Sequence, residues 1–151
     1  MYSYFGLNSL PDGVITWIQM DLEDGDGCAD DLIDAGVPIY QRGASGEAAL
    51  QAAYPDGVPH RYFQTFVDGQ SGGRYVDLLY DNVAYESKVG YMCLSQRIRI
   101  QILKDAWLLE NGQVDRVVWV FYRSDITGRI GATQALIDFL VEHGIEYIYV
   151  E

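Results

Sequence analysis

The sequence contains few of the residues that build disulfide frameworks or zinc sites. Its 151 residues include two cysteines, Cys28 and Cys93, and two histidines, His60 and His143. Two cysteines make neither a disulfide framework nor a zinc site, so we expect free thiols. Neither histidine has a partner at metal-ligand spacing. His143 falls in the last turn of a predicted helix, where we expect it to cap the helix C-terminus.

Long apolar runs are also absent. No apolar stretch approaches the roughly 20 residues of a membrane-spanning helix, so we expect no membrane span. The first residues, Met-Tyr-Ser-Tyr-Phe-Gly, lack the basic segment and apolar core of a secretory signal peptide. An exported form would therefore have to travel within a larger polypeptide or through a dedicated system.

Basic residues are scarce and unevenly placed. The chain has 10 Lys and Arg against 22 Asp and Glu, a net charge of −12, which argues against nucleic-acid binding because such proteins usually carry a basic patch. Residues 1–60 hold one basic residue against ten acids, whereas residues 61–151 hold nine against twelve. We expect one compact domain, in which an acidic N-terminal extension, residues 1–40, packs on a core of residues 41–151.

A β-hairpin is predicted between residues 74 and 88. Two apolar-rich runs, 74–80 and 83–88, flank the pair Asp81-Asn82, which favours a tight two-residue turn. Counting outward from this turn gives the opposed pairs: Tyr80 with Val83, Leu78 with Tyr85, and Asp77 with Glu86.

This register gathers charged groups on one face. Asp77 and Glu86 would repel each other across the hairpin, and Lys88 would share the face of Glu86. A hard divalent cation such as Mg²⁺ would remove the repulsion, because Mg²⁺ is commonly held by one or two carboxylates plus substrate phosphate. An ammonium beside it could orient a water or stabilise developing negative charge. The alternative is a solvent-facing hairpin with a surface Glu/Lys pair.

The other predicted elements complete an α/β pattern with a mixed sheet covered by helices. A nearly continuous apolar run, 116–122, predicts a strand buried on both faces. Ser45 and Ser95 are placed to cap helices. The remaining elements are listed by residue range: strands at 14–20, 61–67 and 145–150, a turn at 68–73, and helices at 45–53, 95–110 and 132–143.

Two helices carry further candidate site residues. Glu47 lies in a first helical turn, where the helix dipole favours a carboxylate; alternatively it is a third acid at the metal site. Arg97, Gln101 and Lys104 project within one narrow sector of their helix. That sector could bind phosphates or orient water, or it could be an ordinary solvated face.

A loop after the buried strand carries two further cations. Arg123 and Arg129 follow residues 116–122, and loops that leave strand ends favour ligand sites in α/β sheets. They are candidates for contacts with a substrate backbone. The alternative is that they form surface salt bridges.

The spacing of Asp77 and Glu86-Ser87-Lys88, followed by a helix, resembles the PD-(D/E)xK restriction-endonuclease-like superfamily. Val76 stands where the motif's name has Pro, and Ser87 fills a position that is often apolar. A wider set of segments resembles nuclease domains at the C-termini of bacterial polymorphic toxins, over roughly residues 40–151. These segments are Gly-Ala-Ser-Gly-Glu at 43–47, Gly-Arg-Tyr-Val-Asp at 73–77, Tyr-Glu-Ser-Lys-Val-Gly at 85–90, Lys104-Asp105, Phe-Tyr-Arg-Ser at 121–124 and Thr127-Gly128.

The resemblance implies a restriction-endonuclease-like core, a mixed central sheet with a catalytic hairpin flanked by helices. It implies that Asp77, Glu86, Glu47 and the backbone carbonyl of Ser87 hold Mg²⁺, for which Mn²⁺ can substitute. Lys88 would then be catalytic. Gln101, together with Glu47, would complete the catalytic site, and Lys104 would line it.

The expected function is a metal-dependent endonuclease that hydrolyses phosphodiester bonds of DNA or RNA, as a bacterial toxin effector domain. We expect delivery within a larger exported toxin, activity in the target-cell cytoplasm, and a cognate immunity protein in the producing cell. The alternative is a non-catalytic protein-binding module on a nuclease-like scaffold.

Overall fold

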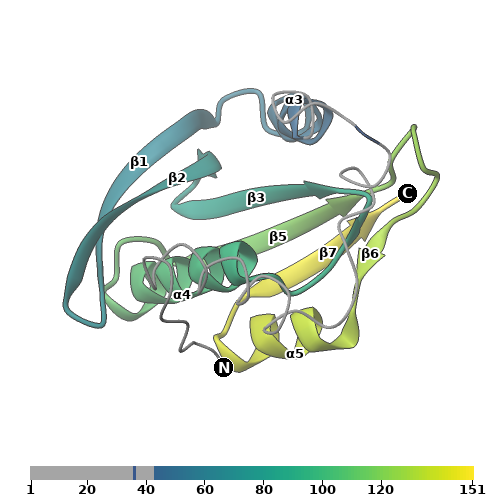
Figure 1. Ribbon diagram of the computed structural model, residues 1–151. Coiled ribbons are helices and arrows are strands. Elements are labelled where there is room, and N and C mark those ends of the chain that lie inside the picture. Colours follow the sequence, from purple (N-terminus) through teal and green to yellow (C-terminus); the bar gives the residue numbers. More distant parts are fainter. Residues whose placement is uncertain (1–35, 37–42) are drawn as a thin grey trace.

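The computed structural model describes Gly36 and residues 43–151 (Figure 1). The strand expected at 14–20 and almost all of the acidic extension, residues 1–40, lie outside the described residues. The elements run in the following order: α3 (Ala44–Ala53), β1 (Val58–Val67), β2 (Gln70–Tyr80), β3 (Val83–Val89), β4 (Tyr91–Met92), α4 (Gln96–Glu110), β5 (Arg116–Tyr122), β6 (Gly131–Ala132), α5 (Gln134–Glu142) and β7 (Glu146–Val150).

A five-stranded mixed sheet forms the centre, in the order β1-β2-β3-β5-β7. The first three strands pair antiparallel, and β3, β5 and β7 pair parallel. Helix α3 lies on one face of the sheet, and α4 and α5 lie on the other (Figure 1). The short strands β4 and β6 pair separately. The expected α/β class with a mixed, helix-covered sheet is therefore confirmed.

The central strand β3 is buried along its whole length between β2 and β5. Its side chains alternate between the faces, as in any strand. Val83 and Tyr85 pack with Leu50 of α3, while Ala84 packs in the cluster that contains Ile102 of α4. By continuing the alternation, β3 directs Ser87 towards α3, and Glu86 and Lys88 towards α4.

The hairpin between β2 and β3 turns as the sequence predicts. Asp81 and Asn82 have φ values of 52° and 59°, so both adopt the left-handed conformation of a type I′ turn. The predicted pairs of Tyr80 with Val83 and of Leu78 with Tyr85 are present.

The pairing of β2 with β3 ends at Leu78 and Tyr85, so Asp77 and Glu86 are not partners in the ladder. The predicted opposition of these two residues is therefore corrected. The backbone N–H of Ser87 donates to the carboxylate of Asp77 at 2.8 Å. The Asp77 side chain thus accepts the hydrogen bond that a backbone carbonyl of β2 would accept in a regular ladder. The strands separate where the charged residues begin.

The ends of several elements depart from the predicted limits. Helix α3 begins at Ala44 with Gly43 as its N-cap, so the predicted cap at Ser45 is wrong. Strand β2 already begins at Gln70, because the turn shrinks to the two residues Asp68 and Gly69. Within β2, Gly73 leaves room for an aromatic neighbour: a Cβ there would lie 2.5 Å from a ring carbon of Tyr62.

Other predicted limits are close to the observed ones. The hydroxyl of Ser95 caps α4 by accepting from the N–H of Ile98 at 3.2 Å. The buried strand 116–122 is found at the predicted residues. His143 is the C-cap of α5, and its Nδ1 lies 2.8 Å from the carbonyl oxygen of Phe139.

None of the helices within residues 43–151 is long and apolar enough to cross a bilayer.

Cys93 is disulfide-bonded, so the expectation of a free thiol is wrong for this residue. Two cysteines are too few for a framework but enough for one bridge; the other, Cys28, lies outside the described residues.

Helix α3 approaches β3 at a glycine, and this contact allows a test. A Cβ on Gly46 would lie 2.8 Å from Oγ and 2.9 Å from Cβ of Ser87. A helical Gly→Ala change gains up to about 1 kcal/mol in propensity, but overpacking costs about 1–3 kcal/mol. We expect Gly46→Ala to lower the free energy of unfolding by about 1 kcal/mol in urea titrations, because the rigid Cβ of Ser87 cannot move aside. Ser45→Ala, at an exposed position of the same helix, is the control. A Gly46→Ala protein more stable than the parent would contradict the close packing.

Candidate active site

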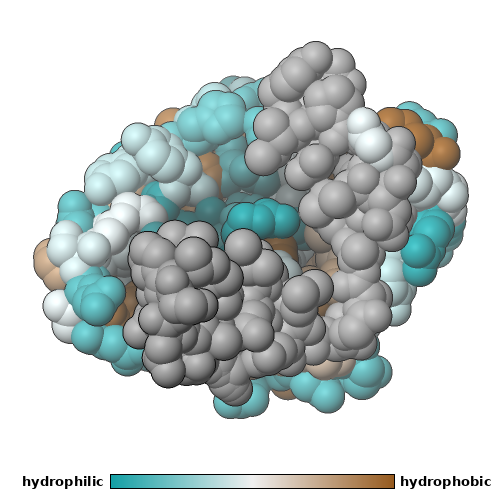
Figure 2. Space-filling model, in the orientation of Figure 1, coloured by the Kyte–Doolittle hydropathy of each residue, from teal (hydrophilic) through white to brown (hydrophobic). Residues whose placement is uncertain are grey.

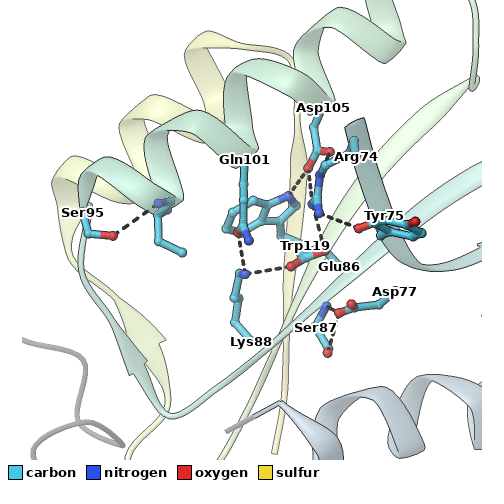
Figure 3. Close-up of polar contacts among 11 residues, drawn as sticks. Arg74, Tyr75, Asp77, Glu86, Ser87, Lys88, Ser95, Gln101, Asp105 and Trp119 are labelled. Atoms are coloured by element: carbon cyan, nitrogen blue, oxygen red, sulfur yellow. Dashed lines mark hydrogen bonds and ion pairs between the residues drawn. The ribbon is translucent and has the colours of Figure 1, made fainter. Parts of the chain in front are cut away.

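A buried ion pair lies on the α4 side of the sheet (Figure 3). Nζ of Lys88 lies 2.7 Å from Oε2 of Glu86 and donates to Oε1 of Gln101 on α4 at 2.8 Å. It also lies 4.7 Å from the ring centroid of Trp119, a cation–π distance. Glu86 and Lys88 are 5% and 8% exposed, so both charges are held with little help from solvent.

Arg74 on β2 connects this pair to a second buried acid, Asp105. Its Nη2 donates to Oε1 of Glu86 at 2.8 Å, and its Nε donates to Oδ1 of Asp105 at 2.7 Å. Oδ2 of Asp105 also accepts from the indole N–H of Trp119 at 2.9 Å. The four buried charges, Arg74, Lys88, Glu86 and Asp105, cancel, which is the condition for holding ions in a low-dielectric interior.

The neighbours of Glu86 decide its ionisation. Burial by itself raises the pKa of the Glu86 carboxyl, but Lys88 and Arg74 outweigh burial and lower the pKa below its ordinary value. Burial disfavours the charged form of Arg74 and by itself lowers its pKa. The carboxylates of Asp105 and Glu86 outweigh burial and raise the pKa of Arg74 above its ordinary value. Glu86 is therefore a carboxylate and Arg74 a guanidinium at neutral pH.

The carboxyl group of Asp77 has a pKa that is raised towards neutrality. Burial, together with the charge of Glu86, raises the pKa of Asp77 from 3.8 to about 6, although hydrogen bonds from Ser87 and the charge of Lys88 act in the opposite direction. Both the N–H and the hydroxyl of Ser87 donate to Oδ2 of Asp77 at 2.8 Å. Oδ1 has no hydrogen bond within the described part of the chain. A carboxyl group perturbed in this way beside a second carboxylate is typical of functional sites.

The third predicted acid, Glu47, lies close to a different residue. Its side chain is 39% exposed, and Oε1 lies 3.4 Å from Nε2 of His60. Across Gly36 and residues 43–151, no cluster of three or more His, Cys, Asp or Glu is arranged to hold a metal. The metal-ligand roles of Asp77, Glu86, Ser87 and Glu47 therefore stay predictions.

The predicted helix sector lines a groove of about 520 Å³ between α4 and β2. Arg97, Gln101 and Lys104 all face it, which confirms that they share one sector. Nζ of Lys104 donates to the backbone carbonyl of Gly73 at 3.0 Å, so this side chain spans from the helix to the strand. The other described residues lining the groove are Gly73, Arg74, Tyr75 and Ile100.

The cations after β5 have other partners. Arg123 donates to the carbonyl of Gly128 at 2.7 Å and to the side chain of Glu151. The guanidinium of Arg129 lies over the ring of Tyr91, 4.4 Å from its centroid. Neither arginine lines the groove. Arg123 thus forms the surface salt bridge that was the alternative, and substrate contact by either residue stays a prediction.

Three residues of the site, Arg74, Asp105 and Trp119, were not predicted from the sequence. One signal for Asp105 was present, because it shares a face of α4 with the apolar residues Ile98, Ile102 and Ala106. A buried acid on such a face requires a cationic partner. No comparable pattern pointed to Arg74 or to Trp119.

Comparison of the chain with protein-family models, with curated proteins and with solved structures gives no match.

Proposed function

We propose that the protein is a metal-dependent nuclease that hydrolyses phosphodiester bonds of DNA or RNA on a restriction-endonuclease-like core. One observation carries the proposal: β3 presents Glu86 and Lys88 to the same partner helix, with their side chains joined at 2.7 Å. Asp77 lies on the neighbouring strand β2, next to the last backbone pair of the two strands, Leu78 with Tyr85. An acid, a second acid and a lysine in this order match what the resemblance requires.

The donor groups fit Mg²⁺, which prefers carboxylate and carbonyl oxygens. Oδ1 of Asp77 is without a hydrogen bond to any described residue, and each oxygen of Glu86 accepts one bond although it can accept two. Asp77, Glu86 and the carbonyl of Ser87 would hold the ion, with Glu47 as the further acid. When bound, the ion would polarise the scissile phosphate and lower the pKa of a water ligand.

The charge balance of the site supports a weak metal affinity without substrate. Asp77, Glu86 and Asp105 carry three negative charges against two positive charges on Arg74 and Lys88. Only one negative charge is uncompensated, so a substrate phosphate would supply part of the negative charge that a divalent ion needs. Mg²⁺ is commonly bound in this shared way.

Lys88 is the proposed catalytic cation. Glu86 and Gln101 fix its Nζ from two sides, and Trp119 lies along a third. A fixed ammonium can orient the attacking water and stabilise the negative charge that develops on the phosphate. The amide nitrogen of Gln101 makes no hydrogen bond within residues 43–151 and is available to the substrate.

The proposal extends to biological context through the resemblance to toxin nuclease domains. The domain would act in the cytoplasm of a target cell after export within a larger toxin. A cognate immunity protein would neutralise it in the producing cell. Arg123 and Arg129, at the end of β5, would add contacts to the substrate backbone.

The second candidate is a protein-binding module without catalysis. It is favoured by Arg74, because a guanidinium that neutralises Glu86 also suits a core that performs no chemistry. The net charge of −12 points the same way. A module of this kind gains no thermal stability from Mg²⁺ or Mn²⁺ beyond general salt effects, whereas a ligand of the native state raises the melting temperature.

A cleavage assay tests the nuclease. Plasmid DNA and total RNA are incubated with the protein in Mg²⁺ or in EDTA, beside Lys88→Ala and a control, Arg116→Ala, which removes an exposed cation paired with Glu146. We expect metal-dependent cleavage, lowered at least about a hundredfold by Lys88→Ala because the transition state loses its fixed charge, and unchanged in the control. Cleavage at the parental rate by Lys88→Ala would exclude the mechanism. Absence of both cleavage and metal binding would favour the binding module.

A further inference from the structure

The middle of β2 presents a fixed aromatic ring beside the groove. Tyr75 lines the groove and is 62% exposed. Its ring centroid lies 4.9 Å from that of Tyr62, with the planes inclined by 57°. Tyr62 in turn lies so close to Gly73 that any Cβ there would overlap it. Figure 2 shows mostly hydrophilic and intermediate residues, with a few hydrophobic ones, over the β1–β2 hairpin at the left of the view. Tyr75 is therefore an exposed ring that Tyr62 supports.

The facing wall of the groove is cationic. Arg97 on α4 is exposed and makes no hydrogen bond or ion pair within the described residues. Lys104 uses one N–H on the carbonyl of Gly73 and retains two. No Asp or Glu is among the described lining residues. In a chain with a net charge of −12, this is a local site for anions.

The groove also leads to the proposed catalytic residues. Gln101 lines it and accepts the hydrogen bond from Lys88. Arg74 lines it and holds Glu86. A ligand in the groove would therefore lie next to side chains that contact both members of the buried pair.

We propose that this groove binds a single strand of nucleic acid, with an unpaired base stacked on Tyr75 and its phosphates at Arg97 and Lys104. This rests on the proposed nuclease function and adds the substrate class, an unpaired strand. Single-strand binders combine aromatic stacking with a positively charged groove in this way. A volume of about 520 Å³ also lies in the range of pockets that enclose small ligands, about 300–1,000 Å³.

The number of cations decides against a duplex. Duplex binders often neutralise about 6–10 phosphates, whereas this groove offers Arg97 and Lys104 in addition to Arg74, which already pairs with two acids. A base can stack on Tyr75 only if it has left its own stack. The preference for a single strand must therefore come from the ring, which a duplex cannot use.

The test measures binding of labelled oligonucleotides of about 12 nucleotides, a length typical of single-strand sites, by fluorescence anisotropy in EDTA. The probes are oligo(A) as RNA and as DNA, each single-stranded and annealed to its complement. We expect both single strands to bind more tightly than their duplexes, and the tighter of the two to indicate whether RNA or DNA is preferred. Tyr75→Ala should weaken this binding roughly 5- to 150-fold, and Tyr75→Phe should retain it.

Matched variants separate stacking from charge and from folding. Tyr149→Ala removes a comparably exposed tyrosine on β7 and should leave binding unchanged. Arg97→Ala and Lys104→Ala should each lower the slope of log affinity against log salt by about 0.7. Equal affinity for duplex and single strand, or no loss in Tyr75→Ala, would overturn the groove assignment.

Cleavage of the same probes in Mg²⁺ distinguishes the two proposals. Binding that depends on Tyr75 without any cleavage would reject the nuclease and keep the groove as a single-strand site. Cleavage of duplex at the parental rate in Tyr75→Ala would keep the nuclease and reject the groove.

Discussion

Asp77→Asn is expected to abolish metal-dependent cleavage and at the same time to stabilise the metal-free protein at alkaline pH. The amide cannot provide the anionic oxygen that the proposed metal requires, so we expect cleavage to fall at least about a thousandfold. Oδ1 of an asparagine can still accept both bonds from Ser87, so the local fold is preserved.

The stability effect follows from the direction of the pKa change. The pKa of Asp77 rises from 3.8 to about 6 on folding, so the native state binds this proton more tightly than the unfolded state. Ionisation of Asp77 therefore destabilises the fold as the pH rises from about 4, with the full penalty above about pH 6. We expect Asp77→Asn to gain at most about 3 kcal/mol in the free energy of unfolding at about pH 8, and about half as much at about pH 5.

Urea titrations at the two pH values, in EDTA, measure this difference. Asp81→Asn removes an exposed acid at the turn of the same hairpin and should leave the pH dependence unaltered. An Asp77→Asn gain that is equal at both pH values would show that the ionisation of Asp77 is not its source. Added Mg²⁺ should stabilise the parent protein but not the variant.

The second large effect is expected at Asp105, an acid on the buried face of α4 with 0% exposure. Asp105→Leu removes the partner of Arg74 and leaves its guanidinium buried with Glu86 alone, while the indole N–H of Trp119 loses its acceptor. Breaking one side of a buried ion pair destabilises a protein by about 3–5 kcal/mol. We expect a loss of that size in urea titrations.

A double mutant identifies the cause. Arg74→Met combined with Asp105→Leu removes both charges and should recover part of the stability, because no unpaired guanidinium remains. The surface control is Asp138→Leu, because Asp138 is exposed on α5 and its carboxylate accepts a hydrogen bond from Gln134. This change should alter stability little. A loss in Asp105→Leu below about 1 kcal/mol would contradict a coupled buried pair. So would a double mutant whose loss of unfolding free energy exceeds the sum of the losses in the two single mutants.

The sequence pattern predicted the local elements of the site. Asp81-Asn82 determined the turn, because few residues adopt positive φ at two consecutive positions as readily. The apolar run 116–122 determined the central parallel strand, and Ser95 the start of α4. Each of these patterns acts over a few residues, where conformational preference is decided locally.

The residues at which strands begin and end were less predictable where a tertiary contact outweighed a local preference. Gly72 and Gly73 indicate a turn by composition, yet they lie within β2 because β1 pairs along them and Tyr62 packs on Gly73. The expected pairing of Asp77 with Glu86 followed from regular counting. It does not occur, because the carboxylate of Asp77 takes the N–H of Ser87 in place of a backbone partner.

The sequence by itself determined that Glu86 and Lys88 share one face of a strand, and that Arg97, Gln101 and Lys104 share one sector of a helix. These relations follow from the periods of the strand and the helix. Only the tertiary structure decided that Lys88 is held by Gln101, and that Arg74 joins Glu86 to Asp105 from 31 residues away along the chain. The physical reason is that a buried charge must be matched by opposite charge from whichever segment packs against it, and packing between distant segments leaves no periodic pattern in the sequence.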